Sequence, residues 1–128
     1  MVTITALYAG IAALMLVWLS LRVSLRRIAL KSSYGDAGDR QLGTAIRLQG
    51  NFTEYVPMAL ILMALAELQG APGWVIHGFG TALIGARIVY FIGYGTTPPK
   101  PLLRQIGMTV TYLLLLVEGL AVLGHAAL

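Results

Sequence analysis

The sequence contains no cysteine, and only 11% of its 128 residues are charged. Without cysteine the chain has no disulfide, no thiolate metal site and no cysteine nucleophile, so sulfur chemistry requires a thiol that a ligand supplies. The low charge accompanies 58% hydrophobic residues and a mean hydropathy of +0.81, which together exclude an ordinary soluble globule. We therefore predict an integral membrane protein.

Four apolar stretches are long enough to cross a bilayer as helices, which takes roughly 20 residues each. Between them the chain is broken by "QGAPGW" and by the proline-rich "TTPPKP", because glycine and proline favour turns over helix interiors. We predict helices over about residues 2–25, 41–69, 73–94 and 101–127. The expected fold class is all-α, a four-helix membrane bundle formed by one domain, residues 1–128.

Basic residues are missing from both ends of the sequence, since all nine lie between Arg22 and Arg104. The segments that follow the first and third predicted helices are basic, and the segment after the second contains no basic residue. Cytoplasmic loops of membrane proteins carry an excess of lysine and arginine. We therefore expect the first and third loops to be cytoplasmic and both termini to lie on the opposite side.

Polar residues interrupt the second and third apolar stretches. At about 100° per residue, Arg47, Asn51 and Glu54 lie on one side of the second predicted helix. A second set shares one side of the third: Arg87, Tyr90 and Tyr94. A charge inside a membrane segment costs at least about 2.5 kcal/mol, so these residues should face a partner or a water-filled cavity. One interpretation is a structural pairing of Glu54 with Arg47 or Arg87; another is an anionic ligand, because donors outnumber carboxylates.

The remaining polar residues give weaker evidence of a functional site. His77 and His125 have no carboxylate or cysteine partner at metal-ligand spacing, so we expect interfacial residues and no metal. Glu67 is expected to be solvated, whereas Glu118, when neutral, can donate a hydrogen bond within the bundle. The glycines of "GFGTALIG" follow no strand and form no nucleotide motif. Nothing in the sequence indicates a nucleic-acid partner.

The segments "RLQGNFTEYVP", residues 47–57, and "RIVYFIGY", residues 87–94, resemble the MAPEG family, the membrane-associated proteins of eicosanoid and glutathione metabolism. The likeness rests on that family's Arg-x-x-x-Asn-x-x-Glu motif and on the order of four helices, and it is strongest to the short bacterial members. It implies a homotrimer in a bacterial inner membrane. It also implies glutathione as co-substrate, bound between adjacent subunits.

The resemblance implies a glutathione site built by the second and third helices with an arginine from the end of the first. These residues are Arg26 or Arg27, Arg47, Asn51, Glu54, Tyr55, Arg87, Tyr90 and Tyr94. Arginines suit the two carboxylates of glutathione, and Glu54 suits its ammonium. Arg104 resembles the catalytic arginine that stabilises the glutathione thiolate in leukotriene-forming relatives. The connection from Tyr94 to Arg104 is longer here than in those relatives, which leaves Lys100 as the alternative cation.

The expected function is a membrane glutathione transferase or peroxidase, acting on a hydrophobic electrophile or lipid hydroperoxide that arrives through the membrane lipid. The alternative is a non-catalytic trimeric scaffold or lipid-binding protein of the same fold. A small multidrug-type transporter is disfavoured, because its membrane glutamate would lie in the first helix, which has none. The identity of the electrophile, and the choice among conjugation, peroxide reduction and isomerisation, have no signature in the sequence.

Overall fold

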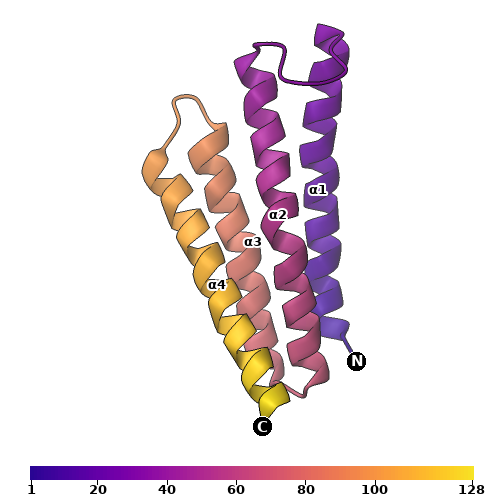
Figure 1. Cartoon of the computed structure of the whole chain (residues 1–128), viewed down its shortest axis with the longest axis vertical. Coiled ribbons are helices and arrows are strands. Elements are labelled where there is room, and N and C mark those ends of the chain that lie inside the picture. The colour runs from indigo at the N-terminus through magenta and orange to yellow at the C-terminus, as the bar shows by residue number, and fades with distance from the viewer.

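The computed structural model describes residues 1–128 and contains four helices. These are α1 (Thr3–Leu30), α2 (Arg40–Leu68), α3 (Gly73–Gly95) and α4 (Pro101–Ala127). They run alternately up and down, so both termini lie at one end of the bundle and the α1–α2 and α3–α4 loops at the other, here called the loop end (Figure 1). All four are long and apolar enough to cross a membrane. The all-α, four-helix prediction is confirmed.

The observed bounds of α1 differ from the predicted range at its C-terminal end. The helix continues to Leu30 rather than residue 25, because "RVSLRRIAL" contains no glycine or proline that would end it. It ends where Lys31 adopts the left-handed conformation, with φ of 55°, and the Ser32 N–H donates to the Arg27 carbonyl at 3.1 Å. Arg26 and Arg27 are therefore helical and project from the last turns of α1.

The helices form two hairpins, α1–α2 and α3–α4, that lean apart toward the loop end (Figure 1). Helices α2 and α3 occupy the middle, since each of them contacts all three other helices. Helices α1 and α4 do not contact one another. The hairpins are held together mainly by the α2–α3 and α2–α4 contacts, with α1 reaching α3 as well. Side chains at the α2–α3 interface therefore determine how the two halves are oriented.

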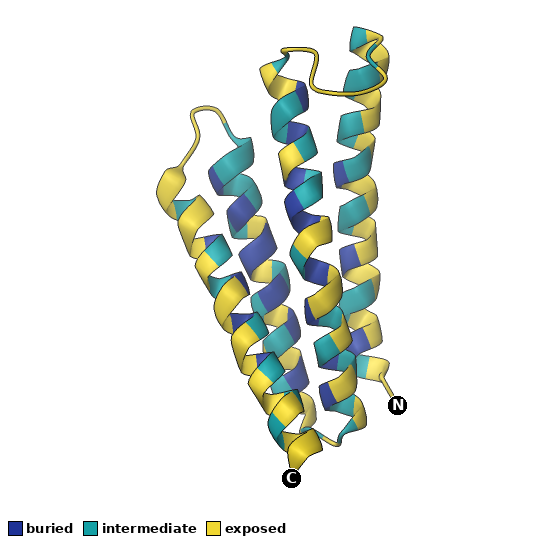
Figure 2. Cartoon of the chain, viewed as in Figure 1, coloured by how far each residue is buried: buried dark blue, intermediate teal, exposed yellow.

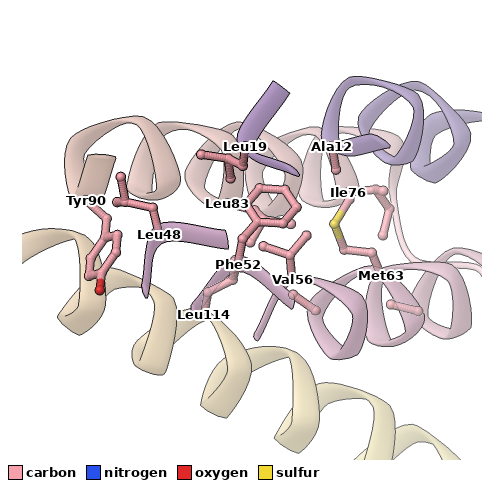
Figure 3. Close-up of a cluster of buried hydrophobic side chains, with 12 residues drawn as sticks. Ala12, Leu19, Leu48, Phe52, Val56, Met63, Ile76, Leu83, Tyr90 and Leu114 are labelled. Atoms are coloured by element: carbon pink, nitrogen blue, oxygen red, sulfur yellow. The ribbon is translucent and has the colours of Figure 1, made fainter. Parts of the chain in front are cut away.

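The buried core is narrow and follows the axis of the bundle, while the outer faces of the helices are exposed (Figure 2). Only 23 of 128 residues are buried. Leu19, Phe52, Leu83 and Leu114, one from each helix, belong to a single cluster (Figure 3). Many of the exposed residues are large and apolar, as expected for surfaces that face lipid rather than water.

Helices α3 and α4 approach most closely where glycine faces backbone. A Cβ atom on Gly107 would lie 2.7 Å from the Ala86 carbonyl oxygen and 2.8 Å from the Tyr90 nitrogen. On the facing helix, a Cβ atom on Gly93 would lie 2.8 Å from Arg104 Cα. Small residues allow membrane helices to pack at short range, where van der Waals contacts are strongest. These two glycines set the spacing of the α3–α4 hairpin.

We expect Gly107→Ala to destabilise the protein by about 1–3 kcal/mol, because the added methyl group meets rigid backbone atoms. Gly119→Ala is the matched control in the same helix, since a Cβ there meets nothing within 4 Å, and alanine is the better helix former. Reversible unfolding in mixed micelles measures both. Equal stability of the two variants would contradict the close approach of α3 and α4 at Gly107.

Candidate functional site

A polar cavity of about 560 Å³ lies at the loop end, between the start of α2, the end of α3 and the start of α4. Its volume is in the range of small-molecule binding sites. Five of its twelve lining residues are charged, and Thr44 and Tyr94 add hydroxyl groups. The charged residues on its wall are Asp36, Asp39, Arg40, Arg47 and Arg104. Three cations against two carboxylates give the cavity a net positive charge, which favours anionic groups.

Arg104 reaches this cavity from the first turn of α4. Its guanidinium carbon lies 5.6 Å from the centre of the Tyr94 ring, a distance at which a cation is attracted to an aromatic face. Gly93, next to Tyr94, permits the backbone of Arg104 to come this close. Lys100, the alternative cation, is exposed and does not line the cavity. Of the two candidates, Arg104 is the one at the cavity wall.

Arg47 and Glu54 of α2 form an ion pair, with Arg47 Nη2 at 3.2 Å from Glu54 Oε1. Their side chains are 50% and 54% exposed. Arg47 also lines the cavity, whereas Glu54 lies outside it. The pair therefore places a carboxylate beside a cavity arginine. In an isolated protomer both side chains are exposed on the outer surface of α2.

Asn51 is buried, unlike Arg47 and Glu54. It is 6% exposed and accepts a hydrogen bond from Nη2 of Arg87, which is 3% exposed. The Arg87 guanidinium carbon is 4.7 Å from the centre of the Tyr90 ring, and Nη1 lies 3.8 Å from the Met108 sulfur. The three polar residues of α2 share one side of the helix but differ in burial, because Asn51 is packed against α3 while Arg47 and Glu54 are about half exposed.

Tyr90 and Tyr94 connect this buried pair to the cavity. Their rings are stacked, with centres 5.8 Å apart and planes at 6°. Arg87, Tyr90, Tyr94 and Arg104 therefore form a continuous series of cation and aromatic contacts from the bundle interior to the cavity wall. Tyr90 is buried, and Tyr94 lines the cavity. Among the predicted α3 residues, Tyr94 is the one that can meet a ligand there.

Tyr55 faces α4 rather than the cavity. Its hydroxyl lies 3.4 Å from that of Tyr112, and the two rings meet edge to face with centres 5.6 Å apart. Tyr112 was not predicted to take part in any site, because nothing in the sequence relates positions so far apart. The Tyr55–Tyr112 contact joins α2 to α4 and leaves Tyr55 outside the cavity within one protomer.

Arg26 and Arg27 hold the α1–α2 loop. Arg26 donates from Nε and Nη2 to the two carboxylate oxygens of Asp39, each at 3.0 Å. Arg27 Nη1 donates to the Gly35 carbonyl at 2.8 Å. Neither arginine lines the cavity. The structure therefore places Arg47, Tyr94 and Arg104 on the wall of one cavity, and it places Arg26 and Arg27 in loop contacts of the same protomer.

Asp39 is a cavity residue that the sequence prediction missed. Its Oδ2 atom accepts the Leu42 N–H at 2.8 Å, so it caps the N-terminus of α2. An aspartate immediately before an apolar helix is a known start signal, and it could have identified this residue. Arg40 and Thr44 also line the cavity, but no sequence motif marks them.

Two glutamates outside the site, Glu67 and Glu118, differ in burial and in hydrogen-bond partners. Glu67 was expected to be solvated, but its carboxylate accepts the N–H groups of Ile4 at 3.0 Å and Thr5 at 2.8 Å. The side chain is partly exposed and also caps α1, because the free N–H groups at the start of α1 lie beside the end of α2 and a carboxylate satisfies them. Glu118 is fully buried in α4, and neither carboxylate oxygen has a hydrogen-bond partner.

Four membrane-length helices with a cationic polar cavity at one end define a small integral membrane protein with a ligand-sized site. Residues 5–124 match the MAPEG family, and the chain belongs to that family, as its motifs predicted. It is 37% identical over 118 residues to the inner membrane protein YecN of Escherichia coli strain K12, covering 92% of this chain and 88% of that protein. The protein of the same name in Escherichia coli O6:H1 matches to the same extent.

The cap of α2 should depend on pH through Asp39. Hydrogen bonds from Arg26, and then from the Leu42 N–H, hold the pKa of the Asp39 carboxyl below its usual range. The ionised Asp39 carboxylate contributes fully to the free energy of unfolding above the unfolded pKa of about 3.9. This contribution is lost as the pH falls through the lower pKa of the folded state. Asp39→Asn keeps a capping oxygen but removes the charge, so hydrogen-exchange protection of the Leu42 amide should lose its acid dependence. Asp36→Asn is the control, and a similar loss there would contradict the assignment.

Proposed function

We propose that this chain is a glutathione-dependent transferase or peroxidase of a bacterial inner membrane. The supporting observation is the cavity at the loop end, which is lined by both Arg47 from α2 and Arg104 from α4. Membership of the MAPEG family and 37% identity to a protein named as an inner membrane protein support the class and the location. Calorimetric titration of the detergent-purified protein with glutathione tests the proposal directly.

The charges of the cavity suit a glutathione molecule. Glutathione carries two carboxylates and one ammonium group, and the cavity offers arginines with nearby carboxylates. Arginine binds carboxylates through two parallel hydrogen bonds, which fixes orientation as well as charge. We assign Arg47 to a glutathione carboxylate and Glu54, its ion-pair partner, to the ammonium. The site is then positioned by buried contacts that hold α2 against α3, made by Asn51, Arg87 and Tyr90.

Arg104 is the group that would activate the thiol. Lowering a thiol pKa by about two units requires roughly 2.7 kcal/mol of preference for the thiolate. A guanidinium about 4 Å away, at an effective dielectric constant near 20, supplies roughly 4 kcal/mol. The thiolate then attacks the electrophilic atom of a hydrophobic substrate, forming a bond to sulfur as the leaving group departs with its electron pair. One cation at the cavity wall is sufficient for this role.

A non-catalytic membrane scaffold is the second candidate, and a specific observation favours it. The polar residues of the two motifs already pair within the chain, Arg47 with Glu54 and Asn51 with Arg87. Such a network needs no ligand to offset the cost of its charges in a membrane segment. If calorimetry detects no heat of glutathione binding to protein that retains its helix content, the scaffold is favoured.

We expect the protein to be a homotrimer. Arg47 and Glu54 are about half exposed on a membrane-spanning helix, and charges there need a neighbouring subunit or a water-filled cavity rather than lipid. The three-fold count comes from the family. Native mass spectrometry from detergent should give three times the 13.7 kDa chain mass. A monomer as the only species would contradict a site shared between subunits.

Arg104→Ala should leave glutathione affinity within a few fold while it removes the thiolate absorbance at neutral pH. The rate profile for conjugation should move to higher pH by about two units, because the bound thiol returns toward its ordinary pKa of about 8.5. Lys100→Ala is the matched control, since Lys100 lies outside the cavity. Loss of thiolate in Lys100→Ala but not in Arg104→Ala would reverse the assignment.

A further inference from the structure

A second polar cavity, of about 420 Å³, lies at the loop end near α1. Arg22 of α1 and Arg40 of α2 both line it, together with Gln41, Thr44 and Thr96. It shares four residues with the candidate glutathione cavity, Arg40, Thr44, Tyr94 and Pro99, whereas Arg22 belongs to this cavity alone. Neither Arg22 nor Arg40 forms an ion pair within the chain. Two uncompensated guanidinium groups therefore face one polar space.

An apolar groove of about 330 Å³ lies between α1, α2 and α3. Ten of its eleven lining residues are apolar, among them Ile11, Met15, Trp18 and Phe91, and the remaining one is Arg87. Trp18 and Ile88 are 51% and 48% exposed, so the groove is open at the outer surface of the protomer. From Ile11 to Trp18 it follows α1 for roughly 10 Å, about two thirds of the ~15 Å hydrocarbon depth of one leaflet.

Arg22 joins the polar cavity to the apolar groove. Its guanidinium carbon is 5.2 Å from the centre of the Trp18 ring and 5.1 Å from that of Phe91. Both rings line the groove, while Arg22 itself lines the polar cavity. The two aromatic rings thus hold the arginine in place by cation–π contacts. The charge is fixed at the boundary between the polar and the apolar space.

From this arrangement we propose that the Arg22 and Arg40 cavity, with the groove beside it, binds an anionic phospholipid of the surrounding bilayer. The lipid phosphate lies between the two arginines, and one acyl chain lies along the Trp18 side of the groove. Basic pockets between membrane helices are suited to anionic headgroups. A soluble anion would occupy the polar cavity alone, whereas a phospholipid would occupy both the cavity and the groove. The inference does not require that glutathione binds: Arg22 lies outside the glutathione cavity, and Arg40 lines both cavities.

Tryptophan fluorescence tests the proposal, because the chain has two tryptophans and Trp18 lies in the groove. In Trp74→Phe protein reconstituted in phosphatidylcholine, brominated phosphatidylglycerol should quench Trp18 at about tenfold lower mole fraction than brominated phosphatidylcholine. Arg22→Gln should reduce this preference about fivefold, the effect expected for one arginine near a lipid phosphate. The ratio of the two lipids corrects for any change that Arg22→Gln causes in Trp18 emission itself.

Lys31→Gln is the charge-matched control, since Lys31 also lies at the loop end but outside both the cavity and the groove. It should keep the preference. Arg40→Gln gives a second test if Arg22→Gln protein does not fold. The proposal would be overturned if both lipids quenched Trp18 equally in the Trp74→Phe protein that keeps both arginines. It would also be overturned if the folded arginine variants kept the full preference for phosphatidylglycerol. Loss of the preference on adding inorganic phosphate would assign the cavity to a soluble anion and would also overturn it.

Discussion

Arg87 lies within a membrane-spanning helix with only 3% of its surface exposed, and its Nη2 group donates to Asn51 of the neighbouring α2. A guanidinium in this position is costly unless its charge is surrounded by acceptors and polarisable groups. Asn51 supplies the acceptor, and the Tyr90 ring supplies the aromatic face. Both helices are thereby restricted in rotation about their axes. Because α2 and α3 connect the two hairpins, this contact sets the relation between the halves of the bundle.

The position of the candidate site depends on the same contact. Once Arg87 faces α2, Tyr90 and Tyr94 follow on the same side of α3, and their stacked rings lead toward the loop end. The close approach at Gly93 and Gly107 then brings the first turn of α4 beside Tyr94. A cationic cavity thus forms where the hairpins lean apart. Its wall combines residues from α2, α3 and α4 that no single helix could bring together.

The start of α2 separates two spaces with different chemistry. On the α4 side the cavity contains Arg47 and Arg104, and on the α1 side Arg22 faces a second polar space beside an apolar groove. The Arg26–Asp39 pair fixes the loop at this point and caps α2. The proposed glutathione-dependent function requires a polar site for the thiol and contact with lipid for an apolar substrate. This end of the bundle provides both kinds of surface side by side.

The sequence by itself determined the four spanning helices and nearly all of their ends, since an apolar run in lipid must satisfy its backbone hydrogen bonds as a helix and proline or glycine interrupts it. It also identified the polar motif, because charges are rare in such segments. Only the tertiary structure decided that Asn51 pairs with Arg87 rather than joining Arg47, and that Arg104 lines the cavity while Lys100 does not. Those outcomes depend on helix rotation, on the glycine contacts between α3 and α4 and on the path of the loops. These are set by contacts between residues distant in sequence, which local patterns do not encode.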